Sequence, residues 1–314
     1  MAGYVVRRVA QSLVALLGVS IVVFALIHLV PGDPVRVALG TRFDQELYEA
    51  LRARAGLDQP LIVQYFDWLA RALTGDLGVS FRTGQPVTSL LLTRLPATAM
   101  LALGALLVGV VIALPAGILS AIRQGKPVDY AASAFSQIGV SVPDFWYGIL
   151  LILLFSVQWR LFPPGGYVPL LEDPVESLRR LVLPALTAGV VTGAILTRFV
   201  RSSVLEALNA EHVRLARAKG LPWRSVLRHH VLRNAWIPVI TVTGLQLGTL
   251  LGGIVVVEVV FAWPGLGRLA LDAVERRDYP LLQGAVLLIA AGFLLINLLV
   301  DLLYAKLDPR IGRS

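Results

Sequence analysis

Residues that could carry catalysis or bind a metal are few in this sequence. It contains no GxxxxGK(S/T) phosphate-binding loop, no HExxH helix, no GxSxG turn and no cysteine. Its histidines are His28, His212, His229 and His230, and the last three belong to one basic segment. We therefore expect no enzyme active site, no cofactor and no metal site on this chain, so any energy-requiring step must be driven by another chain.

Three carboxylates lie within or at the edge of long apolar runs: Asp144, Glu258 and Asp301. A carboxylate at bilayer depth costs a few kcal/mol, so it normally faces a polar cavity or a partner. Asp144 follows Pro143, whose missing N–H frees a carbonyl and loosens a helix. Pro143, Asp144 and Glu258 are candidates for lining a translocation pathway, with structural pairing as the open alternative. Asp301, beside Tyr304, fits an interfacial anchor or a partner for a basic residue.

A polar segment, Glu206–Pro238, separates two apolar runs and is strongly basic. Its charges are Arg214, Arg217, Lys219, Arg224, Arg228 and Arg233 against Glu206 and Glu211. The pattern predicts two short helices, Glu211–Lys219 and Trp223–Trp236. Gly220 can close the first by adopting a positive φ, and Pro222 prevents its simple continuation.

The first of these helices has a composition suited to docking. Ala216, Ala218 and Gly220 are small and allow another backbone to approach closely, while Arg217 and Lys219 can reach acidic or carbonyl groups. The alternative is a merely solvated basic loop that orients the neighbouring helices.

The elements that position these residues are apolar helices. The chain has 314 residues, of which 56% are hydrophobic and 15% charged, and its mean hydropathy of +0.74 is typical of an integral membrane protein. Six runs reach or exceed the roughly 20 residues that one span requires: Ala10–Val30, Ala97–Ile122, Tyr130–Val157, Leu181–Val200, Ile237–Ala262 and Leu282–Tyr304. The first run is read as a retained anchor, because no small-residue cleavage site follows it.

The distribution of charge sets the topology. Basic residues outnumber acidic ones in the N-terminal tail, around Arg123 and Lys126, in the Glu206–Pro238 segment and at the C-terminal end, whereas the alternate segments are balanced. The positive-inside rule then predicts that both termini are cytoplasmic. The net charge of +8 is explained by this topology and does not call for nucleic acid.

The segment 31–95 is too long for a turn and lies outside in this topology. Phe43–Ala55 has helical spacing of Leu47 and Leu51, and Pro60–Leu73 repeats the pattern. We predict three parts. They are an N-terminal tail and first span (1–30), a small extracytoplasmic helical cap (31–95), and a five-helix core (96–314) containing a cytoplasmic loop at 202–236.

Several stretches resemble one family. ARAKGL and RHHVLRNAWIPVIT, FALIHLVPGDP, QPLIVQYFDWLARALTGDLGVSFRTGQPV, VVEVVFAWPGLGRLALDAVERRDYPLLQG and VDLLYAKLDPRI are similar to permeases of ABC importers for dipeptides, oligopeptides and nickel. The general pattern of importer permeases is Glu-Ala-Ala, three residues and Gly, with a Pro further on. Here Arg214, Leu215 and Ala216 fill the first three positions before Gly220, so the Glu is absent. The distance from Gly220 to Pro238 is also longer than in the general pattern. Both departures are typical of the peptide-importer branch.

The resemblance implies an architecture and a set of partners. It implies the first permease subunit of a type I importer, with six transmembrane helices, in a bacterial or archaeal plasma (inner) membrane. A second homologous permease subunit, two ATP-binding subunits that use ATP and Mg, and an extracytoplasmic binding protein would complete the assembly. The coupling helix would be 211–220, with Arg214, Ala216, Arg217, Ala218, Lys219 and Gly220 as its contact residues.

The implied substrate is a di- or oligopeptide. Tight coordination of nickel would favour imidazole ligands, yet His28 is the only histidine near a span; a chelated metal escapes this argument and remains an alternative. An ion-coupled secondary transporter would require relays of ionisable residues within the membrane and often contains an internal repeat. A membrane scaffold that only recruits a partner is a further alternative.

Overall fold

The computed structural model describes residues 2–29, 35–36, 44–54 and 58–307. Some sequence predictions fall outside this part of the chain: those for the Pro31–Pro34 turn, for Phe43 and Ala55, for the side chains of His28, Leu47, Leu51 and Lys306, and for Asp308, Arg310 and Arg313.

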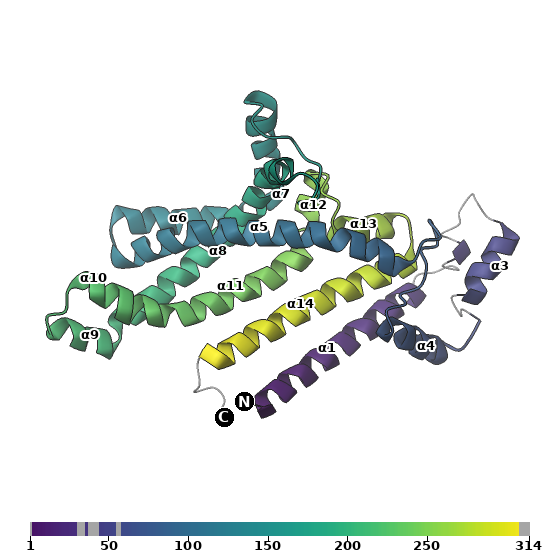
Figure 1. Cartoon of the computed structure of the whole chain (residues 1–314), viewed down its shortest axis with the longest axis horizontal. Helices are drawn as coiled ribbons and strands as arrows, with labels where there is room; N and C mark the ends of the chain where they lie inside the picture. The colour runs from purple at the N-terminus through teal and green to yellow at the C-terminus, as the bar shows by residue number, and fades with distance from the viewer. Residues whose placement is uncertain (1, 30–34, 37–43, 55–57, 308–314) are drawn as a thin grey trace.

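The described residues form an almost entirely helical structure (Figure 1). In chain order the helices are α1 (Ala2–Leu29), α3 (Gln45–Arg54), α4 (Leu61–Leu73), α5 (Val87–Ile122), α6 (Pro127–Ser141), α7 (Asp144–Leu151), α8 (Pro174–Asn209), α9 (Glu211–Ala218), α10 (Trp223–Ser225), α11 (Arg233–Gly253), α12 (Val255–Val260), α13 (Leu266–Glu275) and α14 (Tyr279–Leu307). Two π-helical segments, η2 (Ile152–Gln158) and η3 (Val226–Leu232), follow α7 and α10. Within the described ranges, β pairing is limited to one bridge between Val79 and Pro86. The predicted all-α class is confirmed.

Five helices are long and apolar enough to cross a membrane, and a bent pair supplies the sixth candidate. The five are Gly3–Ala25, Val87–Ile122, Pro174–Asn209, Trp223–Gly253 and Tyr279–Ala305. The pair consists of Pro127–Ser141 and Asp144–Gln158, which meet at an angle of 99°. The predicted interruption at Pro143 is therefore a sharp break, and the expectation of six spans holds when the bent pair counts as one.

The centre of the fold is the parallel pair α5 and α8, which run side by side through most of their length (Figure 1). A methyl group on Gly109 would lie 2.9 Å from Thr192 Cγ2, and one on Gly117 would lie 2.6 Å from Val200 Cβ. Glycine at these positions permits close backbone approach, the usual way helices associate where lipid surrounds them.

Helix α14 lies between α11 and α1 (Figure 1). Gly244 of α11 faces Val300 of α14 at the same kind of close contact. On α1, Arg8 forms an ion pair with Asp301, with 3.2 Å between Arg8 Nη1 and Asp301 Oδ2. Asp301 is therefore paired with a basic residue, one of the two roles expected for it.

Several helices extend beyond the apolar runs that predicted them. Helix α5 begins at Val87, so residues 87–95 of the predicted cap belong to the core helix. Helix α8 begins at Pro174, because Asp173 accepts hydrogen bonds from the backbone N–H groups of Val175 and Glu176 at 3.1 and 3.0 Å and caps the helix. Apolar length marks the part of a helix in lipid, whereas hydrogen bonding continues into polar residues at the surface.

The predicted cytoplasmic loop is shorter than 202–236. Helix α8 continues to Asn209, and the next long helix begins at Trp223 and runs through η3 into α11. The second predicted short helix is therefore the start of a span, and the true connection covers 210–222.

Candidate functional site: the α9 tip and the contacts beneath it

Helix α9 forms the tip of the connection between α8 and α11 (Figure 1). It begins after Ala210, whose backbone is extended, and its last turn closes where Gly220 N–H donates to Arg217 O at 2.9 Å. Gly220 has a φ of +77°, a region that glycine enters without strain. The predicted helix and its glycine break are confirmed.

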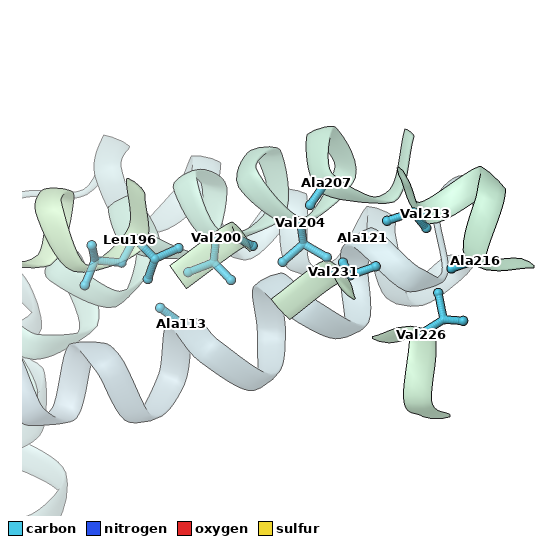
Figure 2. Close-up of a cluster of buried hydrophobic side chains, with 12 residues drawn as sticks. Ala113, Ala121, Leu196, Val200, Val204, Ala207, Val213, Ala216, Val226 and Val231 are labelled. Atoms are coloured by element: carbon cyan, nitrogen blue, oxygen red, sulfur yellow. The ribbon is translucent and has the colours of Figure 1, made fainter. Parts of the chain in front are cut away.

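One side of α9 is anchored to the rest of the chain by apolar packing. Figure 2 shows Val213 and Ala216 next to Val226, with Val204 of α8 in the same buried cluster. Ala216 is buried in this cluster. The structure thus places Ala216 on the internal face of α9, which corrects the expectation that its small side chain faces a partner.

A polar network fixes the same helix from its N-terminal turn. The side-chain amide Nδ2 of Asn234 lies 3.0 Å from His212 Nε2 and donates to His230 O at 2.8 Å. His212 Nε2 is also 3.3 Å from His230 O. The His212 ring and the backbone carbonyl of His230 thus hold α9 against the start of the next long helix.

The other side of α9 is an open surface that we call the α9 tip. It consists of Arg214, Leu215, Arg217, Ala218, Lys219, Gly220, Leu221 and Trp223, all of which are exposed. The Arg217 guanidinium carbon lies 4.6 Å from the centre of the Trp223 ring, a cation–π contact that orients both side chains. A methyl group on Gly220 would meet no atom within 4 Å.

The apolar part of this tip was not anticipated from the sequence. Leu215, Leu221 and Trp223 are large apolar residues exposed to solvent, and a mixture of apolar and basic groups is common in protein interfaces. The signal lay in the helical register: Val213 and Ala216 share one face of α9, which leaves Leu215 on another.

A buried carboxylate, Asp129, joins three helix ends close to this tip. Its oxygens accept hydrogen bonds from Ser120 Oγ at 2.5 Å and Gly125 N at 2.9 Å, and from Arg201 Nε and Nη2 at 2.6 and 2.9 Å. Asp129 is 5% exposed. The contact connects the end of α5, the start of α6 and the C-terminal part of α8. Asp129 was not among the candidates from the sequence; its place in the first turn of a helix was the available signal.

The second functional candidate from the sequence, Glu258, is a buried structural residue. It is 1% exposed, and it accepts hydrogen bonds from Thr98 Oγ1 at 2.7 Å and from Arg268 N at 2.8 Å. Thr98 Oγ1 in turn accepts from Leu266 N at 2.7 Å. The carboxylate thus binds the free N–H groups at the start of α13. Of the two roles left open for Glu258, this geometry supports structural pairing and counts against pathway lining.

Asp144 has a different setting. It is the first residue of α7, directly after the break between α6 and α7, and it is partly exposed. Its Oδ1 accepts from the N–H of Phe145 at 2.8 Å. Pro143, which precedes it, is exposed. The structure therefore does not join Asp144 and Glu258 in one hydrogen-bonded site, and the bend leaves the Pro143–Asp144 pair accessible.

A third buried carboxylate, Asp278, lies at the start of α14. It accepts hydrogen bonds from Ser80 Oγ and from Phe81 N, the latter at 3.2 Å. It is also almost completely buried. This contact ties the turn at 78–86 to the first turn of α14, so part of the predicted outer cap is integrated into the core.

Matches to known families cover nearly the whole chain. Residues 113–313 match the family "Binding-protein-dependent transport system inner membrane component", and residues 1–102 match its N-terminal family, "Binding-prot-dependent transport system membrane comp, N-term".

Curated relatives share about two-fifths of the sequence. The chain is 39% identical to the dipeptide transport system permease protein DppB of Escherichia coli (strain K12), with 98% of each chain covered. It is 40% identical to the oligopeptide transport system permease protein AppB of Bacillus subtilis (strain 168) and to the glutathione transport system permease protein GsiC of Escherichia coli (strain K12), each with 99% of both chains covered.

Solved structures share the fold. An amino acid ABC transporter chain matches with a TM-score of 0.52 and 20% identity, over 71% of this chain and 94% of that one. A chain of the MetNI methionine ABC transporter in an inward-facing conformation matches with a TM-score of 0.54 and 21% identity, over 70% and 96%. The fold is that of an ABC importer permease. Together with the two family matches, this shows that the chain belongs to the family of binding-protein-dependent transport system inner membrane components and is a multi-pass permease subunit of the inner membrane rather than an enzyme.

Proposed function

We propose that this chain is a permease subunit of an ATP-driven importer for di- or oligopeptides. The observation that carries the proposal is the identity of 39–40% over nearly the full chain to permeases named for dipeptide, oligopeptide and glutathione transport. Glutathione is itself a small peptide, so these relatives share a substrate class. An ion-coupled secondary transporter is not favoured, because the family works with a binding protein.

The proposed assembly contains a second permease subunit, two ATP-binding subunits and an extracytoplasmic binding protein. ATP and Mg would act on the ATP-binding subunits, and both termini of this chain would lie in the cytoplasm. The basic residues of the α9 tip support that orientation, since basic segments remain on the cytoplasmic side.

Within this assembly, the α9 tip is the proposed contact with an ATP-binding subunit. Its exposed members from the predicted set are Arg214, Arg217, Ala218, Lys219 and Gly220, whereas Ala216 supports the helix from beneath. The buried contacts of Val213 give α9 a firm connection to α8 and η3. A helix held in this way can pass a displacement of the partner into the spans.

The proposed transport pathway passes the break between α6 and α7. Pro143 and Asp144 lie there, where irregular backbone is tolerated in a membrane protein if it borders a water-filled cavity or is packed in protein. A binding protein settles selectivity before the substrate arrives, so a weak polar surface of this kind suits the permease.

The experiment is reconstitution of the complete complex with its binding protein in liposomes. We expect uptake of a labelled dipeptide or tripeptide that requires ATP hydrolysis and stops with a non-hydrolysable ATP analogue. Free Ni²⁺ and a chelated metal are assayed in parallel in the same vesicles. Metal uptake without peptide uptake would overturn the peptide assignment, and uptake that persists without hydrolysis would overturn ATP coupling.

A further inference from the structure

Helix α4, Leu61–Leu73, has three chemically different faces. The first packs on α1: Tyr65 Oη lies 2.9 Å from Ser20 Oγ, and the ring of Phe24 lies 5.4 Å from the Tyr65 ring and 6.0 Å from the Trp68 ring, centre to centre. This face holds α4 against the C-terminal half of α1, as Figure 1 also shows.

The second face is an apolar stripe without a covering element among the described residues. Ile62 is 72% exposed, Phe66 is 60% exposed and Leu73 is 81% exposed. Their spacing of four and seven residues brings them to one side of a helix. Exposed apolar side chains in such a row indicate a surface that is covered in the working protein.

The third face is polar. Asp67 and Arg71 are four residues apart and therefore lie on one side of α4. They lie away from the stripe of Ile62 and Phe66. A helix with one apolar and one charged side is suited to the boundary between lipid and water.

The contacts with α1 fix the depth of α4. Ser20 and Phe24 both belong to the C-terminal half of the predicted apolar run Ala10–Val30. At about 1.5 Å of rise per residue, Phe24, which contacts Trp68, lies about 9 Å inside the end of that run. Interfacial helices bury their apolar side to about 5–10 Å, so α4 sits at the depth where such helices lie.

The surface of α1 continues this apolar stripe. Val14, Leu17 and Ile21 are exposed along α1, which packs on α14 and α4. Only 11% of this span is buried within the chain. The stripe on α4 therefore borders a second exposed apolar surface, on a helix long and apolar enough to cross a membrane.

We propose that α4 is an interfacial helix that anchors the segment between α1 and α5 in the membrane. Its stripe of Ile62, Phe66 and Leu73 enters the bilayer at the C-terminal end of α1, which is the outer leaflet in the predicted topology, and Asp67 and Arg71 face water. The bound partner is the lipid surface itself. Anchoring at this point sets the height of the preceding segment above the membrane.

The test uses the absence of cysteine from this chain. Ile62→Cys, Phe66→Cys, Asp67→Cys and Arg71→Cys are each introduced as the only cysteine of the complete complex, which is spin-labelled and returned to liposomes. Collisions with oxygen, which enters lipid, and with a water-soluble nickel chelate are measured for each label. Val14→Cys on α1 is the lipid reference and Gln124→Cys, in the exposed turn after α5, is the water reference.

We expect the ratio of oxygen to nickel collisions to be several-fold higher at positions 62 and 66 than at positions 67 and 71, and to approach that of the Val14 label. Nickel access to positions 62 and 66 equal to that of the Gln124 label would overturn the proposal, because the stripe would then lie in water. Protection of these positions from both reagents would also overturn it, because a protein would then cover the stripe. Unchanged peptide-stimulated ATPase activity of the labelled complexes shows that each variant is folded.

Discussion

Arg201 of α8 holds Asp129 at the start of α6 through two hydrogen bonds, Nε to Oδ1 at 2.6 Å and Nη2 to Oδ2 at 2.9 Å. Two parallel hydrogen bonds fix the planes of the guanidinium and the carboxylate relative to each other, and together they are stronger than a single hydrogen bond. One turn further along α8, Val204 packs in the cluster that supports α9. The polar clamp and the apolar cluster together connect the α9 tip with the neighbouring ends of α5, α6 and α8.

Replacing Arg201 should therefore destabilise the protein and weaken coupling. Arg201→Gln leaves Asp129 buried with fewer donors, and losing a hydrogen bond to a charged group costs about 1.5–3 kcal/mol. We expect a lower unfolding temperature of the purified complex and less stimulation of ATPase activity by substrate. Arg198→Gln is the matched control, since Arg198 is on the same helix and exposed. Equal melting temperatures for the two variants would contradict the clamp.

Gly220 allows bulk at the α9 tip to be separated from backbone strain. Gly220→Trp places a large side chain where this chain has no neighbouring atom, so we expect normal insertion but loss of the ATP-binding subunits and of transport. Gly220→Asn is the control for conformation, because Asn tolerates positive φ. The matched control for position is Gly125→Trp, since Gly125 has a φ of +74° and equally open space. Copurification and uptake are measured for each. Normal assembly of Gly220→Trp would show that the contact with the ATP-binding subunits lies outside this part of the α9 tip.

The exposed leucine of α9 tests whether apolar contact contributes to this docking. Leu215→Asp changes a side chain that faces solvent in this chain, so the melting temperature should be unchanged while binding of the ATP-binding subunits weakens by at least tenfold, about 1.4 kcal/mol. Leu171→Asp changes another exposed leucine, which lies outside the α9 tip, and should leave that affinity unchanged. Affinity is measured by titration of labelled ATP-binding subunit. A drop in stability instead would show that Leu215 packs internally.

The segment before α4, which the sequence predicts to lie outside the membrane, is expected to help receive the binding protein. A deletion that reaches Phe81 would also remove Ser80 and its contact with Asp278, and so would disturb the core. Replacing only Gln45–Arg54, the length of α3, by a Gly/Ser linker avoids this damage. We expect normal melting and basal ATPase activity, with loss of stimulation by loaded binding protein. Full stimulation of ATPase activity in this variant would show that α3 is not needed to receive the binding protein.

The general fold could be predicted because apolar length and helix breakers are local signals. The runs around α5, α8 and α14 predicted spans, and Gly220 and Pro222 predicted the end of α9. Helix ends were less accurate, because capping by Asp173 lies outside the apolar run.

The partners of the buried carboxylates could not be predicted. Asp129 pairs with Arg201, 72 residues away, and Glu258 pairs with Thr98, 160 residues away. The sequence indicates that a carboxylate in an apolar run requires compensation, but it does not say which donor supplies it. For the same reason, the burial of Ala216 became visible only once α9 was placed on η3.

Asp144 and Glu258, grouped together by the sequence, should now respond differently to substitution. Asp144 is partly exposed at the break before α7, so Asp144→Asn removes a charge from an accessible surface without removing internal contacts. We expect assembly and melting to be normal and peptide uptake to fall. The matched variants are Glu258→Gln, which retains the shape of the side chain, and Glu258→Ala, which does not.

Glu258→Ala leaves Thr98 Oγ1 and the N–H of Arg268 without their acceptor. Each buried group left unpaired costs about 1–3 kcal/mol, so the complex should melt at a lower temperature and assemble poorly. Glu258→Gln still offers one acceptor oxygen, and the Thr98 hydroxyl can rotate, so its uptake per assembled complex should stay near normal. Uptake and melting temperature are measured together for all three variants. Full uptake by Asp144→Asn would show that the charge of Asp144 is not needed in the transport pathway. A selective loss of uptake in Glu258→Gln, with a normal melting temperature, would show that Glu258 does act in the pathway.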